Sequence, residues 1–165
     1  MCGIVGFVNC GNKQELTKAV SVITHRGPNF SGVNWFDQNK SGLGHARLSI
    51  IDLSKNGNQP MYDKSTGNWI VFNGEVYNYQ EIKKELSNLG YIFYSKTDTE
   101  VVLKAYGHWG KNAINRFNGM FSFGIYNDKS EHLFVCRDRL GIKPLYYYQN
   151  NEQLIFASEI KSILE

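Results

Sequence analysis

The sequence of 165 residues lacks the features of several whole classes of protein. It has no apolar run long enough to cross a membrane, and its start lacks the basic and then apolar pattern of a secretion signal. Its three cysteines are an odd number without the spacing of a zinc site, which predicts reduced thiols in a cytoplasmic protein. The net charge is only +3, with acids and bases interspersed. Neither a nucleic-acid partner nor a membrane partner is therefore expected.

The apolar residues that are present recur with two different periods. Strands are predicted over residues 3–9, 31–37, 42–50, 69–72, 120–126, 132–136, 145–148 and 154–157. Residues 52–62 are expected to form a long loop, and Asn73-Gly74-Glu75 is expected to form a turn after the apolar strand 69–72. Short turns between the last four strands favour antiparallel sheets. Near-continuous apolar runs favour sheets that are covered on both faces.

Helices are predicted between these strands. Asn12, Asn78 and Thr97 each stand three residues before a glutamate and just before residues with helical apolar spacing, which is the pattern of an N-cap. A further helix is expected to begin near Ser158. Strands at both ends with helices between and after them predict an α+β fold built in layers.

Cys2 is the first candidate for chemistry. Removal of Met1 would give this residue a free α-amine beside its thiol, so that one residue would carry both a base and a nucleophile. An α-amine titrates at roughly 7.7–8.0, close to working pH, so it can accept a thiol proton. Taken alone, a cysteine at position 2 is more often an ordinary small apolar residue. The functional interpretation therefore depends on the rest of the chain.

Eight motifs follow one another along the chain. They are Cys2-Gly3-Ile4-Val5-Gly6, His25-Arg26-Gly27-Pro28, Arg47-Leu48-Ser49-Ile50-Ile51-Asp52, Asn73-Gly74-Glu75-Val76-Tyr77-Asn78, Thr97-Asp98-Thr99-Glu100, Gly119-Met120-Phe121, the segment from Arg137 to Tyr147, and Phe156-Ala157-Ser158-Glu159-Ile160-Lys161. Together they closely resemble the N-terminal glutamine amidotransferase domain of glutamine-hydrolysing asparagine synthetases. The resemblance implies the N-terminal-nucleophile hydrolase fold, a four-layer α/β/β/α sandwich of two mainly antiparallel sheets. It also implies a glutaminase domain over residues 2–165, with an ATP-dependent synthetase domain after residue 165.

The resemblance assigns catalytic roles. Cys2 would attack the side-chain amide of glutamine, with its own α-amine as general base, and water would hydrolyse the thioester to glutamate. The Asn73 side-chain amide and the Gly74 N–H would form the oxyanion hole. A plain Asn-Gly turn is the structural alternative for these two residues.

A glutamine pocket is implied in the same way. Arg47 would bind the α-carboxylate with its planar fork. Asp98, assisted by Glu75, would accept the α-ammonium, although an acid in the first turn of a helix is also stabilised by the helix dipole alone. The remaining pocket residues, acting mainly through their backbone, would be Leu48, Ser49, Ile50 and Ile51.

The implied function is glutamine hydrolysis that supplies ammonia for ATP-dependent conversion of aspartate to asparagine. L-Glutamine and the synthetase domain of the same polypeptide would be the partners, and a homodimer is one possible assembly. No cofactor or metal is expected in this domain, whereas ATP and Mg²⁺ would serve the synthetase domain. Two alternatives stay open: the same glutaminase serving a sugar or other metabolite acceptor, and a non-catalytic glutamine-binding or docking module that keeps Met1. A pair of Cys2 with His45 is disfavoured, because the α-amine already supplies a base.

Overall fold

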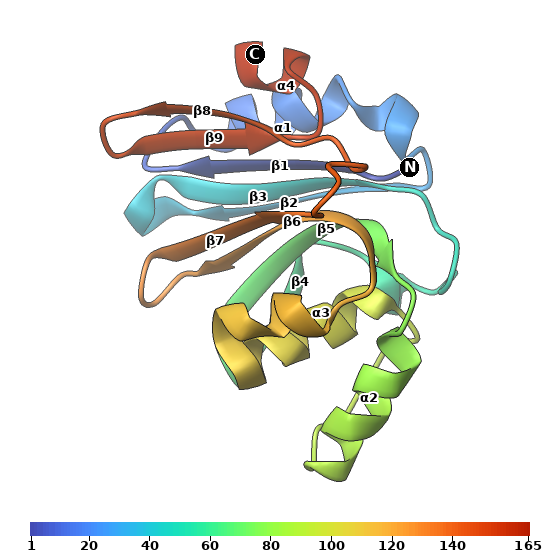
Figure 1. Ribbon diagram of the computed structural model, residues 1–165. Helices are drawn as coiled ribbons and strands as arrows, with labels where there is room; N and C mark the ends of the chain where they lie inside the picture. Colours follow the sequence, from blue (N-terminus) through green and yellow to red (C-terminus); the bar gives the residue numbers. More distant parts are fainter.

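The computed structural model describes residues 1–165 and consists of two antiparallel sheets with helices on their outer faces (Figure 1). Helices α1 and α4 cover the first sheet, and α3 with α2 beside it covers the second. The inner faces of the two sheets pack together through β1, β3 and β5. The predicted α/β/β/α sandwich is therefore confirmed. No helix is both long and apolar enough to span a membrane.

The first sheet has five strands in the order β2-β3-β1-β9-β8, and the second has four in the order β4-β5-β6-β7. The strands of the first sheet are β1 (Gly3–Val8), β2 (Phe30–Phe36), β3 (Ser41–Arg47), β8 (Tyr146–Asn150) and β9 (Gln153–Ala157). Those of the second are β4 (Met61–Asp63), β5 (Asn68–Val76), β6 (Gly119–Asn127) and β7 (His132–Arg137). The central β1 pairs with β3 and β9, which lie far from each other in the sequence.

The helices are α1 (Lys13–Ser21), α2 (Tyr79–Asn88), α3 (Asp98–Trp109) and α4 (Lys161–Leu164). Two of the three predicted N-caps are confirmed, because the Asn12 side chain accepts from the N–H groups of Gln14 and Glu15, and that of Thr97 accepts from the Glu100 N–H. Asn78 also occupies the N-cap position of its helix, but its side chain makes no capping hydrogen bond. That side chain instead joins the carbonyl of Arg116 to the N–H of Asn118 and so holds the approach to β6.

Three apolar clusters fill the spaces between the four layers. The largest lies between the second sheet and α2 and α3, and a smaller one lies between the first sheet and α1. The cluster between the sheets is built around Ile4, Leu43, Val71, Tyr126 and Phe156. The sheets can approach this closely because Gly6 and Gly124 make room for the Phe156 ring, which a Cβ at either position would meet at 2.1 or 2.3 Å.

The structure corrects two expectations for the second sheet. The strand predicted over 69–72 continues to Val76, so that Asn73-Gly74-Glu75 does not form a turn. Asn73 pairs with Ser122 and Gly74 with Phe121, because the nine-residue β6 supplies partners along the whole of β5. The expected loop over 52–62 ends in a short strand, β4, which pairs with the first residues of β5. Similarly, β3 ends at Arg47 rather than at residue 50.

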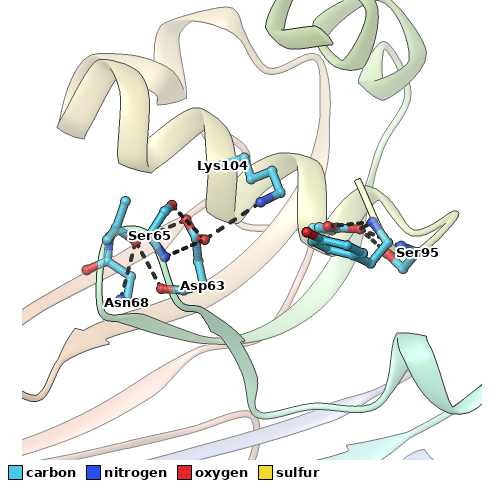
Figure 2. Close-up of polar contacts among 8 residues, drawn as sticks. Asp63, Ser65, Asn68, Ser95 and Lys104 are labelled. Carbon is cyan, nitrogen blue, oxygen red and sulfur yellow. Dashed lines mark hydrogen bonds and ion pairs between the residues drawn. The ribbon is translucent and has the colours of Figure 1, made fainter. Parts of the chain in front are cut away.

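The hairpin between β4 and β5 is tied to α3 by polar groups. The Asp63 carboxylate accepts from the N–H and Oγ of Ser65 and lies 3.7 Å from Lys104 Nζ (Figure 2). Along the same helix, Glu100 accepts from the N–H and Oγ of Ser95. A cavity of about 820 Å³ lies beside these groups, between the hairpin and the segment before α3. It contains none of the residues predicted to bind or convert glutamine.

Candidate active site

A second cavity, of about 340 Å³, lies where the ends of several strands meet the start of α3. Because β1 and β3 are antiparallel with Gly3 opposite Ala46, the start of β1 lies beside the end of β3, which brings Cys2 close to Arg47. Strand β5 and the first turn of α3 form the other side. Nine of the ten predicted site residues line this cavity: Cys2, Arg47, Leu48, Ile50, Ile51, Asn73, Gly74, Glu75 and Asp98.

Ser49 is the one predicted site residue that does not line the cavity. Its N–H donates to Asn29 Oδ1 at 2.9 Å and so ties the segment after β3 to the start of β2. The expectation that Ser49 forms part of the pocket wall is therefore not met by the structure.

Cys2 lies at the end of the cavity, just before β1. Its Sγ is 3.4 Å from the Leu48 N–H and 3.7 Å from the Leu48 carbonyl oxygen. Burial raises the pKa of this thiol above its ordinary value, so the thiol holds its proton at neutral pH. Met1 lies at the rim with 56% of its surface exposed, and its Sδ is 3.4 Å from Lys143 Nζ. While Met1 is attached, the nitrogen of Cys2 is a peptide N–H and cannot act as a base.

Asn73 and Gly74 lie in the middle of β5, facing the same cavity. Asn73 is 1% exposed, and its Nδ2 is buried without a hydrogen-bond partner. Buried donors of this kind are rare because each loses its hydrogen bonds to water. At Gly74 a Cβ would come within 2.4 Å of the Met120 carbonyl, so only glycine allows the observed pairing with β6. The Asn73 side chain thus carries a donor that no protein group uses, and it lies on a strand that is paired with β6.

Arg47 is held by the segment that follows β3. Its Nη1 donates to the Ser54 carbonyl and to Asn58 Oδ1, and its Nη2 donates to the Asp52 carbonyl. A guanidinium has five N–H donors, of which these bonds use three. The Nε–H and one Nη2–H remain without a protein partner. Guanidinium N–H groups of this kind are strong donors to a carboxylate.

Asp98 is the first residue of α3 and is buried against β5. Its Oδ2 accepts from the Val76 N–H at 3.0 Å. Burial raises the pKa of Asp98 to about 6, and the nearby Glu75 carboxylate adds to that effect. The cavity therefore has a cationic group at the end of β3 and acidic groups on β5 and α3. Such an arrangement suits a small zwitterion that carries a carboxylate and an ammonium.

The cavity also contains residues that the sequence analysis did not assign to it. The most informative is Gln59, whose Oε1 accepts from the Phe72 N–H at 2.6 Å while its Nε2 donates to Thr99 Oγ1 at 3.1 Å. It therefore links β5 to α3 directly beneath the pocket. Nothing local marks Gln59 in the sequence, since it lies within the segment expected to be a loop. The other unassigned lining residues are Met1, Asp52, Gly57, Phe72, Thr97, Thr99, Met120 and Lys143.

His45 does not form a pair with Cys2. It lies opposite Ile4 in the pairing of β3 with β1, and its Nε2 is 3.2 Å from the Phe72 carbonyl. Complete burial lowers its pKa to about 3, so the ring is neutral at physiological pH. His45 thus belongs to the layer between the sheets. No group of three or more His, Cys, Asp or Glu side chains is placed to hold a metal ion.

The fold is shared with amidotransferases of known structure. The glutamine phosphoribosylpyrophosphate amidotransferase of B. subtilis, solved with ADP and GMP, superposes with a TM-score of 0.83 over 98% of this chain and 43% of that one. The two sequences are only 21% identical, so this likeness establishes the fold. The chain is therefore a four-layer α/β/β/α sandwich with a cavity at the start of β1.

Sequence relatives specify the family. The family described as "Glutamine amidotransferase domain" matches residues 1–165, and the chain belongs to it. It is 44% identical to asparagine synthetase [glutamine-hydrolyzing] 1 of Bacillus subtilis, over 99% of this chain and 27% of that protein. It is 33% identical to asparagine synthetase B [glutamine-hydrolyzing] of Escherichia coli, over 99% and 30%. It is also 41% identical to amidase chry2 of Gibberella zeae, over 99% and 26%. The chain thus spans about a quarter to a third of the length of these relatives.

Proposed function

We propose that the cavity binds L-glutamine and that Cys2, once Met1 has been removed, hydrolyses it to glutamate and ammonia. The observation that carries this proposal is the unpartnered Nδ2 of Asn73, buried in the cavity that also contains the thiol. An unpaired buried donor costs stability, so its presence beside a nucleophile is explained if a charge develops there during the reaction. Membership of the glutamine amidotransferase family supports the same conclusion.

The proposed reaction begins with the transfer of the Cys2 thiol proton to the α-amine of the same residue. A base is needed because burial raises the thiol pKa. The sulfur attacks the side-chain amide carbon of glutamine, and the oxygen that gains negative charge accepts from Asn73 Nδ2 and the Gly74 N–H. The ammonium returns its proton to the departing nitrogen, ammonia leaves, and a thioester to Cys2 remains. Water then attacks the thioester and releases glutamate and the thiol.

Two charged residues would hold the main-chain end of glutamine. The unused N–H donors of Arg47 would receive the α-carboxylate, while Asp98 and Glu75 would receive the α-ammonium. A bound ammonium favours the ionised form of Asp98, so binding would lower the raised pKa of that group. The segment Leu48–Ile51 would close the pocket over the aliphatic part of the substrate.

The whole protein would use the ammonia in an ATP-dependent synthesis of asparagine from aspartate. Two of the relatives reported above are named as glutamine-hydrolysing asparagine synthetases, and each is more than three times as long as this chain. The additional length would contain the synthetase domain and the ATP and Mg²⁺ that it uses. Exposed apolar side chains suitable for contact with another domain, or with a second copy in a homodimer, occur at Leu140, Ile142, Tyr146, Tyr147 and Tyr148. The three cysteines of the chain are free, which is consistent with a cytoplasmic location of the protein.

A different acceptor is the main alternative, since the relative from Gibberella zeae is named an amidase although it is 41% identical. The glutaminase reaction would be the same, and only the molecule that receives ammonia would differ. Assay of the whole polypeptide with ATP, glutamine and aspartate separates the two, because formation of asparagine is expected only in the first case.

The test of the glutaminase proposal is replacement of the nucleophile. In protein whose intact mass shows that Met1 is absent, Cys2→Ala should abolish glutamate formation, while Cys10→Ala, at the far end of β1, should leave it normal. Because Cys2→Ala keeps Arg47 and Asp98, it should still bind glutamine. Glutamate formation by Cys2→Ala would contradict the proposal. Retention of Met1 with glutamine binding but no hydrolysis would instead support the non-catalytic module.

A further inference from the structure

The peptide group of Cys2 is held by a side chain rather than by the sheet. Strand β1 begins at Gly3, so Cys2 lies just outside the ladder. Its carbonyl oxygen accepts from Arg26 Nε at 2.9 Å. Arg26 ends the 3₁₀ turn after α1, and only 10% of its side chain is exposed. After removal of Met1, Cys2 would be the free end of the chain. The hydrogen bond from Arg26 Nε to its carbonyl would then be the main contact that fixes its backbone.

Glu159 in turn holds the guanidinium of Arg26. Its Oε1 accepts from Arg26 Nη1 at 2.9 Å and lies 3.0 Å from His25 Nε2, while its Oε2 lies 3.1 Å from Lys161 Nζ. Partial burial would raise the pKa of Glu159, but the hydrogen bonds from Arg26, Lys161 and His25 outweigh it and lower the pKa to about 2. The carboxylate is therefore ionised throughout the physiological range. Glu159 does not line the glutamine cavity.

The backbone beside Glu159 is fixed to β1 as well. The Ser158 N–H donates to the Ile4 carbonyl at 2.9 Å, and the Ile4 N–H donates to Ser158 Oγ at 3.0 Å. The end of β9 and the start of β1 thus form one rigid unit. The Glu159 side chain extends from this unit toward Arg26. Arg26 therefore donates to Glu159 through Nη1 and to the Cys2 carbonyl through Nε.

We propose that Glu159 is a positioning residue for the nucleophile, acting through Arg26 on the carbonyl of Cys2. The proposal rests on the proposed glutaminase function. Rotation about the Cα–C bond of an N-terminal residue moves its amine and its thiol together. A charge-assisted hydrogen bond on the carbonyl restricts that rotation and keeps the sulfur aimed at the substrate amide. Glu159 restrains the fork of Arg26 through Nη1, and Arg26 Nη2 is buried without a partner.

The experiment compares Glu159→Gln with a matched control in the whole polypeptide with Cys2 at its N-terminus. The control is Glu85→Gln, because Glu85 also holds an arginine, Arg116, with both oxygens 3.0 Å from Nη1, but on the surface far from the cavity. Glu159→Gln should lower kcat for glutamine hydrolysis about ten- to a hundredfold, the range expected for a misplaced reacting group, with little change in KM. Alkylation of Cys2 by iodoacetamide should slow as well. The control should change neither quantity.

A double-mutant cycle tests whether Glu159 acts through Arg26. The double variant Arg26→Lys/Glu159→Gln should hydrolyse glutamine no more slowly than Arg26→Lys alone. The first substitution already removes the guanidinium through which Glu159 is proposed to act. Independent, multiplying effects would overturn the proposal, as would a kcat of Glu159→Gln equal to that of the control. If Glu159→Gln does not fold, Glu159→Asp is compared with the control in its place. This variant keeps the carboxylate but moves it by the length of one methylene group. If Cys2→Ala itself kept glutaminase activity, the proposed function would fail, and the two failures are thereby distinguished.

Discussion

The sharpest consequence of the site concerns Asn73, for which activity should fall steeply while stability is kept. Asn73→Ala removes the Nδ2–H that would face the developing oxyanion. Loss of one such donor typically lowers kcat by about 10²–10³, equivalent to about 2.7–4 kcal/mol. KM should change much less, because the donor is needed chiefly after negative charge has formed.

The stability of the fold should respond differently, because Asn73 Nδ2 makes no hydrogen bond in the folded protein. Its truncation breaks no protein contact of that donor, and it removes a desolvation cost of about 1–3 kcal/mol. The loss of packing from the amide group acts in the other direction. The free energy of unfolding should therefore stay within about 1 kcal/mol of its original value, or rise. For a domain of this size, 1 kcal/mol shifts Tm by about 2–4 °C.

Asn127 provides the matched control on the neighbouring strand β6. Its Nδ2 donates to the Thr66 carbonyl and to Asn68 Oδ1, and its Oδ1 accepts from the N–H groups of Lys129 and Ser130. Asn127→Ala should lower Tm and leave kcat per folded molecule normal. The assay is steady-state glutamate release beside thermal unfolding for both variants. A normal kcat in Asn73→Ala, or a fall in its Tm as large as that of Asn127→Ala, would refute the catalytic assignment.

The remaining predictions concern the binding of glutamine by Arg47 and Asp98. Arg47→Lys should raise KM for glutamine about tenfold or more, because an ammonium has only three N–H donors, as many as the Ser54 carbonyl, Asn58 Oδ1 and the Asp52 carbonyl already accept from Arg47, and so has none left for a carboxylate; unchanged affinity by calorimetry would contradict this placement. The pKa of Asp98, raised to about 6 in the empty site, predicts that KM rises as the pH falls through about 6, since the protonated group cannot pair with an ammonium. A folded pKa above the ordinary 3.8 also means that ionisation lowers stability as pH rises from about 4 through 6. Asp98→Asn should consequently raise Tm at pH 7.5 while raising KM, and a fall in both quantities would contradict the assignment.

Local patterns predicted the elements whose ends are determined locally. The side chains of Asn12 and Thr97 form the caps that their spacing indicated, because N-capping needs only the first turn of the helix. Asn78 shows the limit of this reasoning. It has the same spacing, but its amide is used by Arg116 and Asn118, which are about forty residues away in the sequence. A local pattern cannot reveal such a competing partner.

The largest error in the fold concerned Asn73 and Gly74, the residues proposed to form the oxyanion hole. Asn-Gly is a strong turn signal, and Asn73-Gly74 was expected to end a strand. In the structure, β6 continues the ladder past both residues, so the glycine serves close pairing rather than a turn. The chemical roles assigned by resemblance do not depend on this point, since they need only a donor near Cys2. Gln59 could not be predicted in the same way, because its function depends on the two elements that it joins.

The first turn of α3 contains two acids whose charges the fold compensates to different degrees. Asp98 and Glu100 are equally buried and two residues apart. The Glu100 carboxylate accepts from Tyr94 N–H, Ser95 N–H and Ser95 Oγ, so its charge is compensated within the fold. Asp98 instead lines the cavity, and burial keeps its pKa high. Together with the unpaired amide of Asn73, this acid leaves the empty cavity with polar groups that are poorly compensated by the protein. A ligand that supplies an ammonium to Asp98 and a negatively charged oxygen to Asn73 would relieve both costs, and the proposed reaction of glutamine at the Cys2 thiol supplies both groups.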